Sequence, residues 1–130
     1  MDKLLAKKIN LLVHLAQVDG KFHDSEQKLL HTILKEKGFE GKAPLESQAD
    51  MSVAEQIKEV PEKTELLYWA IRMMKADDVI HPEELAYCKT LAAKLKFTAE
   101  VVDHFASHDN TLTLAEFEKA SARFIINTNA

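Results

Sequence analysis

The amino-acid sequence predicts an all-α fold of about seven helices. Apolar residues recur at the three- and four-residue spacing of a buried helix face through most of the 130 residues. No segment shows the alternation of a half-buried strand, and three glycines and three prolines leave few positions for tight turns. With 46% hydrophobic and 29% charged residues, the composition is typical of one globular domain, spanning residues 1–130.

The N-terminal part carries two apolar stripes, each predicting one helix. The first comprises Leu5, Ile9, Leu12 and Ala16, with Leu4, Leu11, Leu15 and Val18 beside it. The second comprises Leu29, Leu30, Ile33 and Leu34. Asp24 and Gln27 have the spacing of a capping pair at the start of this second helix, and Gly38 suits its C-terminus. Residues 40–50 read as a linker.

Capping signals mark where the later helices begin. Capping boxes are predicted at residues 52–55 (SVAE) and 113–116 (TLAE). Pro82 suits the first turn of a helix, whereas Pro61 is expected to close the short helix before it. Thr98 is expected to cap another short helix.

Apolar stripes follow these signals as well. They comprise Leu85, Cys88, Leu91, Ala92 and Leu95, then Val101, Val102 and Phe105, then Leu114, Phe117, Ser121, Phe124 and Ile125. In the fourth predicted helix, which comes before the stripe that begins at Leu85, Trp69, Met73 and Met74 are predicted to pack in the core rather than to form a partner surface.

The charge balance and cysteine usage exclude several functions. The net charge of −4 does not supply the dense basic surface that nucleic-acid binding requires. A single cysteine, Cys88, precludes an intrachain disulfide and favours the cytoplasm, where it is expected to be an inert core thiol. The N-terminal apolar stretch is interrupted by lysines, and no run of about 18 apolar residues predicts a membrane span. No nucleophile elbow, phosphate-binding glycine loop or metalloprotease motif indicates an enzyme.

An internal repeat appears when the sequence is shifted by 58 positions. The segment 18–39 then lies over 76–97. The matching pairs are Asp19 with Asp77, His23 with His81, Glu26 with Glu84, Thr32 with Thr90, and Phe39 with Phe97. We therefore predict two helix–turn–helix units, approximately residues 4–39 and 62–97, followed by C-terminal helices at 98–127.

The paired segments QVDGKFHDSE and KADDVIHPEE resemble the TerB-like family of bacterial tellurite-resistance proteins, which includes a domain of the co-chaperone DjlA. In that family a helix ends in Ala-Asp-Gly and a glutamate stands early in the next helix; here Asp78 replaces the second glycine. The resemblance covers roughly residues 4–97. It implies a divalent-metal site at Asp19, Glu26, Asp77 and Glu84, a role in stress or tellurite resistance, and a setting near the inner membrane surface.

The residues themselves leave the nature of this site open. An EF-hand is excluded, because aligning Asp19 and Glu26 on its fifth and twelfth positions puts Leu15 and Gln17 on the first and third. A shared site built from both repeats could hold one Ca²⁺ or Mg²⁺ between four carboxylates. The same side chains could instead only stabilise their turns and helix N-termini.

Three function classes follow from these readings. The first is a non-enzymatic module that binds a divalent cation, a protein partner or both. The second is a metal-dependent enzyme that uses the acidic cluster, or the His104 and His108 pair, whose four-residue spacing can chelate zinc. The third is a helical protein-interaction domain without a metal.

Overall fold

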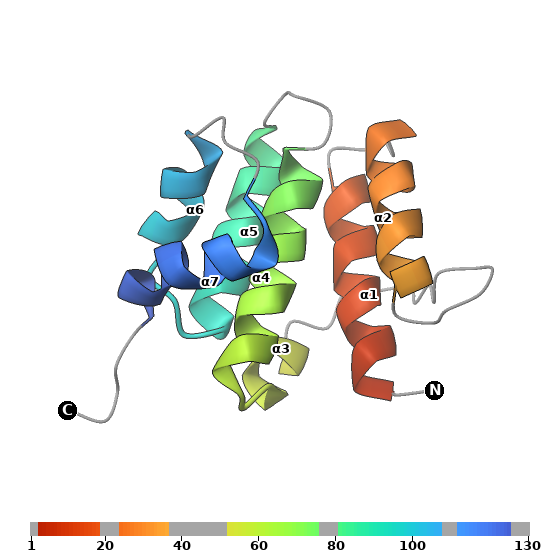
Figure 1. The fold of residues 1–130 in the computed structure, drawn as a ribbon. Coiled ribbons are helices and arrows are strands. Elements are labelled where there is room, and N and C mark those ends of the chain that lie inside the picture. The colour runs from red at the N-terminus through yellow and green to blue at the C-terminus, as the bar shows by residue number, and fades with distance from the viewer. Residues whose placement is uncertain (1–2, 19–23, 37–51, 76–80, 108–111, 126–130) are drawn as a thin grey trace.

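The structure is a computed structural model that describes residues 3–18, 24–36, 52–75, 81–107 and 112–125. In this part of the chain every regular element is helical, which confirms the all-α prediction (Figure 1). The elements are α1 (Lys3–Gln17), α2 (Asp24–Glu36), α3 (Ser52–Gln56), α4 (Val60–Met74), α5 (Pro82–Lys94), α6 (Glu100–Ala106), α7 (Leu114–Ser121) and the short 3₁₀ helix η1 (Ala122–Phe124).

Helix α4 lies at the centre of the bundle. It packs against α1, α5 and α7, and it also contacts α2 and α6. Helix α1 packs in addition against α2, α3 and α5. Figure 1 shows α1 and α4 running in the same direction, and α2 and α5 returning antiparallel to them. As a result, α2 and α5 begin at the same end of the bundle, the upper end in this view.

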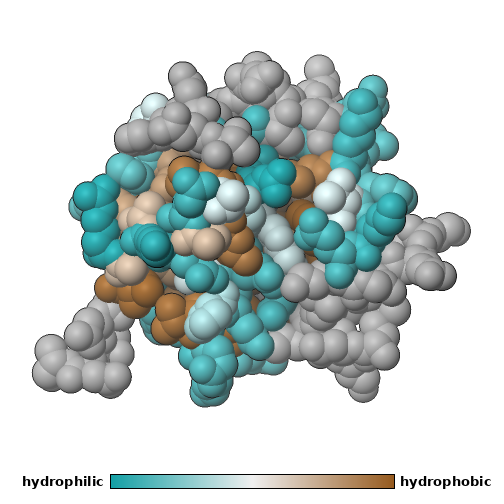
Figure 2. All heavy atoms as spheres, viewed as in Figure 1, coloured by the Kyte–Doolittle hydropathy of each residue, from teal (hydrophilic) through white to brown (hydrophobic). Residues whose placement is uncertain are grey.

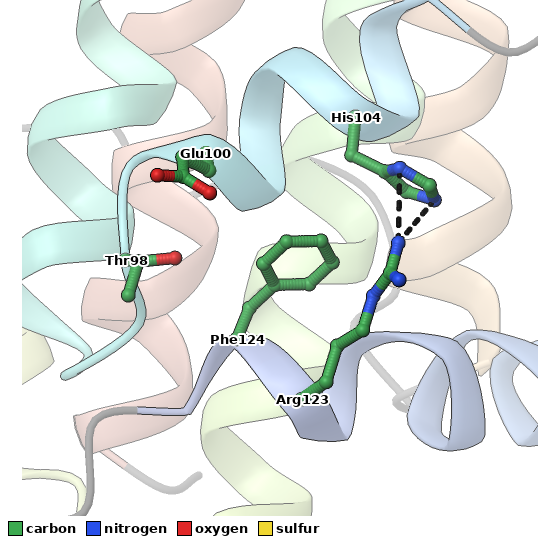
Figure 3. Close-up of a pocket in the computed structure, with 5 residues that line it drawn as sticks. All are labelled: Thr98, Glu100, His104, Arg123 and Phe124. Carbon is green, nitrogen blue, oxygen red and sulfur yellow. Dashed lines mark hydrogen bonds between the residues drawn. The ribbon is translucent and has the colours of Figure 1, made fainter.

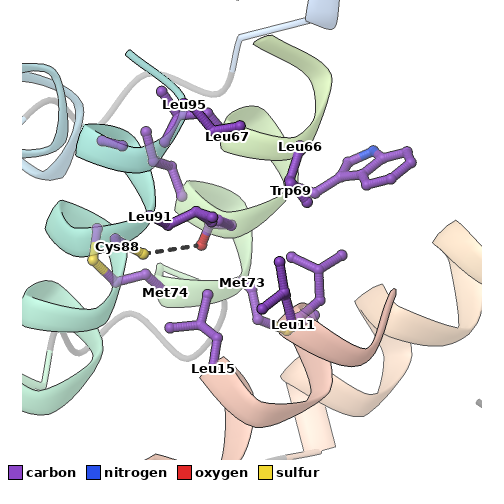
Figure 4. Packing of buried hydrophobic residues seen from close by; sticks show 14 of the residues in the cluster. Leu11, Leu15, Leu66, Leu67, Trp69, Met73, Met74, Cys88, Leu91 and Leu95 are labelled. Carbon is purple, nitrogen blue, oxygen red and sulfur yellow. Dashed lines mark hydrogen bonds between the residues drawn. The ribbon is translucent and has the colours of Figure 1, made fainter. Parts of the chain in front are cut away.

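A cluster of buried apolar side chains fills the space between these helices (Figure 4). The side chains labelled in that figure are Leu11, Leu15, Leu66, Leu67, Trp69, Met73, Met74, Cys88, Leu91 and Leu95. Burying one such side chain contributes about 1.5–3 kcal/mol relative to leaving it in water. Trp69 is only 4% exposed, and Met73 and Met74 are fully buried, so their predicted place in the core is confirmed.

The helix starts confirm two of the predicted signals. Pro82 occupies the first turn of α5, where its missing N–H removes no helical hydrogen bond. Thr113 and Glu116 form the predicted capping box at α7. The Thr113 N–H donates to Glu116 Oε1 at 3.0 Å, and the Glu116 N–H donates to Thr113 Oγ1 at 3.2 Å. These hydrogen bonds lower the pKa of the Glu116 carboxyl.

Two other predicted signals are wrong. Pro61 does not close a helix but stands in the first turn of α4, with Glu59 at the cap position, because proline's fixed φ suits a helix start equally well. Thr98 does not cap α6: Ala99 holds the cap position without a side-chain hydrogen bond, and Thr98 Oγ1 is buried beside it. At 52–55, helix α3 begins at Ser52 itself, and Glu55 pairs with Lys94 at 3.0 Å.

The chain turns sharply after α5 and pairs with the end of the molecule. Lys96 takes the left-handed conformation, with φ of 68°, which a helix C-terminus often uses. Phe97 then forms an isolated antiparallel bridge with Ile125, and the Thr98 N–H donates to the Phe124 carbonyl at 2.8 Å. This contact fixes η1 beside the start of α6.

The surface of the described residues offers few large apolar side chains. Figure 2 shows a face on which hydrophilic residues are interspersed with smaller apolar areas. Among the described residues, the exposed large hydrophobic side chains are Val18 and Val60. Within the same residues, no helix is long and apolar enough to cross a membrane.

A hydrogen bond between α5 and α1 leads to a first prediction. The Tyr87 hydroxyl donates to the Leu11 carbonyl at 2.8 Å, and Tyr87 is half-buried. We expect Tyr87→Phe to lower the free energy of unfolding by about 1 kcal/mol, because it removes this bond and keeps the ring. Urea denaturation at neutral pH measures the difference.

The same variant also changes the response to alkaline pH. Burial raises the pKa of Tyr87 above its ordinary value of 10.0, so the folded protein keeps the phenol protonated where the unfolded chain ionises it. The stability that results is present below pH 10.0 and is lost as the pH rises further. Above that pH, the free energy of unfolding should fall more steeply for the wild type than for Tyr87→Phe. Equal slopes would contradict this.

Candidate functional site

The first turns of α2 and α5 carry the candidate site. Both turns are acidic, with Asp24 and Glu26 in α2 and with Glu83 and Glu84 in α5. Negative side chains are favourable there, because the helix dipole and the free N–H groups present positive potential. Glu26 and Glu84 are each the third residue of their helix.

Glu26 and Glu84 are both buried, which is the unusual feature of this end of the bundle. Each is only 1% exposed, whereas Asp24 and Glu83 in the same turns are exposed. Glutamate is rarely buried to this extent, because an ionised carboxylate loses its hydration and requires hydrogen bonds, a paired cation or a metal ion. The two carboxylates are therefore the strongest candidates for a functional role among the described residues.

Glu84 faces the core of the bundle. It precedes Cys88 by four residues on the same buried face of α5, and its charge contributes, after burial itself, to raising the pKa of the Cys88 thiol. His81, at the cap position of α5, places Nε2 3.8 Å from Glu84 Oε1, so the two form an ion pair whenever the imidazole is protonated. The His81 side chain is 27% exposed, whereas the Glu84 side chain is 1% exposed.

Cys88 itself is a fully buried thiol, as predicted. Its Sγ donates to the Ala70 carbonyl of α4 at 3.6 Å (Figure 4). Burial keeps the thiol in its neutral form, which is a poor nucleophile and a poor metal ligand.

The structure places two of the four predicted metal ligands. Asp19 and Asp77 lie outside the described residues, as do His23 and His108. Within the described part of the chain, no group of three or more His, Cys, Asp or Glu side chains is arranged to hold a metal ion. The shared four-carboxylate site therefore stays a prediction, and so does the zinc pair of His104 and His108.

Other matched positions of the predicted repeat also behave alike. The hydroxyls of Thr32 and Thr90 each donate to the carbonyl four residues earlier, at 3.0 and 3.1 Å. Together with Glu26 and Glu84, these positions have the same local role in α2 and α5. The repeat as a whole stays a prediction.

Sequence reasoning identified the two glutamates but not their burial. One signal was available for Glu84: it stands four residues before Cys88 and seven before Leu91, on the helix face that forms the core. Glu26 likewise stands four residues before Leu30 and seven before Ile33. The proximity of His81 to Glu84, three residues apart across a helix start, was also missed.

Comparisons of the chain with family models, with curated proteins and with solved structures found no match. The TerB-like resemblance thus rests on the paired acidic segments alone and remains an expectation.

Proposed function

We propose that this chain is a non-enzymatic helical module that binds a divalent cation, Ca²⁺ or Mg²⁺, at the end of the bundle where α2 and α5 begin. The observation that supports it is the burial of Glu26 and Glu84 at the same position of two helices. Both helices begin at the same end of the molecule (Figure 1). Carboxylate oxygens are the ligands that these hard cations prefer.

Both glutamates stand in the first turn of a helix, where the first N–H groups and the helix dipole stabilise negative charge. Ionised carboxylates removed from bulk water bind a cation more strongly than exposed ones, since their attraction is screened less. Asp19 and Asp77, each five residues before the first residue of α2 or α5 in the sequence, would supply the remaining protein oxygens. The TerB-like resemblance extends the proposal to a module of bacterial stress or tellurite resistance, in which the cation could prepare this acidic end for a protein partner.

Calorimetric titration with Ca²⁺, Mg²⁺ and Zn²⁺ tests the proposal. We expect the wild type to bind Ca²⁺ or Mg²⁺ with a dissociation constant below about 1 mM. Glu26→Gln/Glu84→Gln should bind at least about tenfold more weakly, because it removes the charge and keeps the shape. The matched control is Asp24→Asn/Glu83→Gln, which removes the same charge from the exposed side chains of the same two turns.

Thermal unfolding gives a second readout. The bound ion should raise the melting temperature of the wild type and of the control variant. At a free ion concentration one hundred times the dissociation constant, it should add about 2.7 kcal/mol to the free energy of unfolding. Circular dichroism establishes that the glutamine variant still folds. The proposal fails if the wild type binds no ion below about 1 mM, or if the glutamine variant binds as tightly as the wild type.

A further inference from the structure

A pocket lies away from the two buried glutamates, between the start of α6 and η1 (Figure 3). It has a volume of about 480 Å³ and is lined by Thr98, Glu100, His104, Arg123 and Phe124. This volume is within the range of small-molecule sites, about 300–1,000 Å³. The Thr98–Phe124 hydrogen bond described above joins its two walls.

One side of the pocket presents a positioned cation. Arg123 Nη2 lies 3.3 Å from His104 Nδ1 and 3.4 Å from its Nε2, within hydrogen-bond distance of the imidazole nitrogens (Figure 3). The Arg123 Cζ is also 4.7 Å from the centre of the Phe124 ring. Among the described residues, no carboxylate forms an ion pair with Arg123. The contacts with His104 and Phe124 thus hold the guanidinium in place, and its other N–H groups can donate to a ligand.

The other side presents oxygen atoms. Figure 3 shows Thr98 and Glu100 across the Phe124 ring from Arg123. Within the described structure, Thr98 Oγ1 is buried without a hydrogen-bond partner, an arrangement that is unfavourable unless a ligand or water completes it. The Glu100 side chain is exposed and adds a negative charge to this side.

From this arrangement we propose that the pocket binds a small zwitterion of the size of a free amino acid, with its carboxylate on Arg123 and its ammonium between Thr98 and Glu100. A guanidinium pairs a carboxylate through two parallel hydrogen bonds. The threonine hydroxyl and the glutamate carboxylate accept hydrogen bonds from an ammonium group. The Phe124 ring lies between the two charges, where the aliphatic part of such a ligand would rest.

The opposite charges of the two sides select against other ligand classes. A phosphate or sulfate dianion would meet the Glu100 carboxylate, and a simple amine would meet the Arg123 guanidinium. Like-charge contacts of this kind disfavour the wrong ligand more than they weaken the right one.

Heteronuclear NMR titration in the absence of divalent ions tests the site separately from the cation proposal. The probes are L-leucine, 4-methylpentanoate, which lacks the amine, and 3-methylbutylamine, which lacks the carboxylate. We expect L-leucine to shift the amide signals of Thr98, His104 and Arg123 with a millimolar dissociation constant, and each analogue to bind at least about tenfold more weakly.

Two substitutions assign the roles. Arg123→Gln and Glu100→Gln should each weaken L-leucine binding at least about tenfold, and because both side chains are exposed, both variants should fold. Arg72→Gln is the matched control for the arginine, since Arg72 stacks on Tyr68 at 5.4 Å outside the pocket. Glu83→Gln is the control for the glutamate.

Absence of any shift of the pocket's amide signals on addition of L-leucine would overturn the proposal. Binding of 4-methylpentanoate as tight as that of L-leucine would overturn it too, by revealing a carboxylate site alone.

Discussion

Replacing Leu91 with alanine should lower the free energy of unfolding by about 2–5 kcal/mol. Leu91 is fully buried in α5, on the face that packs against the central helix α4 (Figure 4). The substitution removes the transfer free energy of three carbon atoms and leaves a cavity that the surrounding helices can fill only in part. A loss of this size is a large fraction of the 5–15 kcal/mol by which a domain is usually stable.

Urea denaturation followed by circular dichroism measures the effect, and two variants calibrate it. Leu91→Met keeps most of the volume and should lose less than about 1.5 kcal/mol. Leu85→Ala makes the same chemical change in the same helix at a half-buried position, so it should lose clearly less than Leu91→Ala. If Leu85→Ala and Leu91→Ala were equally destabilised, the contact between α5 and α4 would not have the central role that the structure gives it.

The helical stripes could be predicted because they depend only on the spacing of apolar residues. The buried positions of α5 and α7, such as Leu91 and Phe117, lie on the stripes predicted for them. The capping box at Thr113 could be predicted for a similar reason, since both partners lie within three residues. Thr98 carries the same cap-forming side chain, but its backbone is held by Phe124, which lies far along the chain. A local signal could not reveal that constraint.

At the candidate site, too, the features set by nearby residues could be predicted from the sequence, and those set by the packing of distant helices could not. The pairing of Glu26 with Glu84 could be found from the repeat, because it is a property of the sequence alone. Their burial depends on how α2 and α5 pack against the rest of the bundle. The pocket at Arg123 was not predicted at all, because His104 and Arg123 come from different helices 19 residues apart.

The largest local effect is expected at Phe117, whose replacement by alanine should remove about 3–5 kcal/mol. Its ring is 2% exposed and lies 4.6 Å from the Phe105 ring of α6 and 5.3 Å from the Tyr68 ring of α4, measured between centroids. Helix α7 has only eight residues, too few to be stable without tertiary contacts. Phe117→Ala should therefore release α7 before the rest of the bundle unfolds.

Hydrogen exchange of the α7 amides, together with urea denaturation, distinguishes this local release from global unfolding. The matched control is Ala115→Ser, an exposed change in the same helix that should leave both measurements nearly unaltered. Arg123 and Phe124 belong to η1, which directly follows α7. Phe117→Ala should therefore also abolish L-leucine binding at the proposed zwitterion pocket, while leaving any cation binding at Glu26 and Glu84 in place. If the α7 amides of Phe117→Ala stay protected from hydrogen exchange, the predicted local release is wrong. The hydrogen bond from the Tyr68 hydroxyl to the Leu112 carbonyl, at 2.6 Å, would then be sufficient to hold α7 in place.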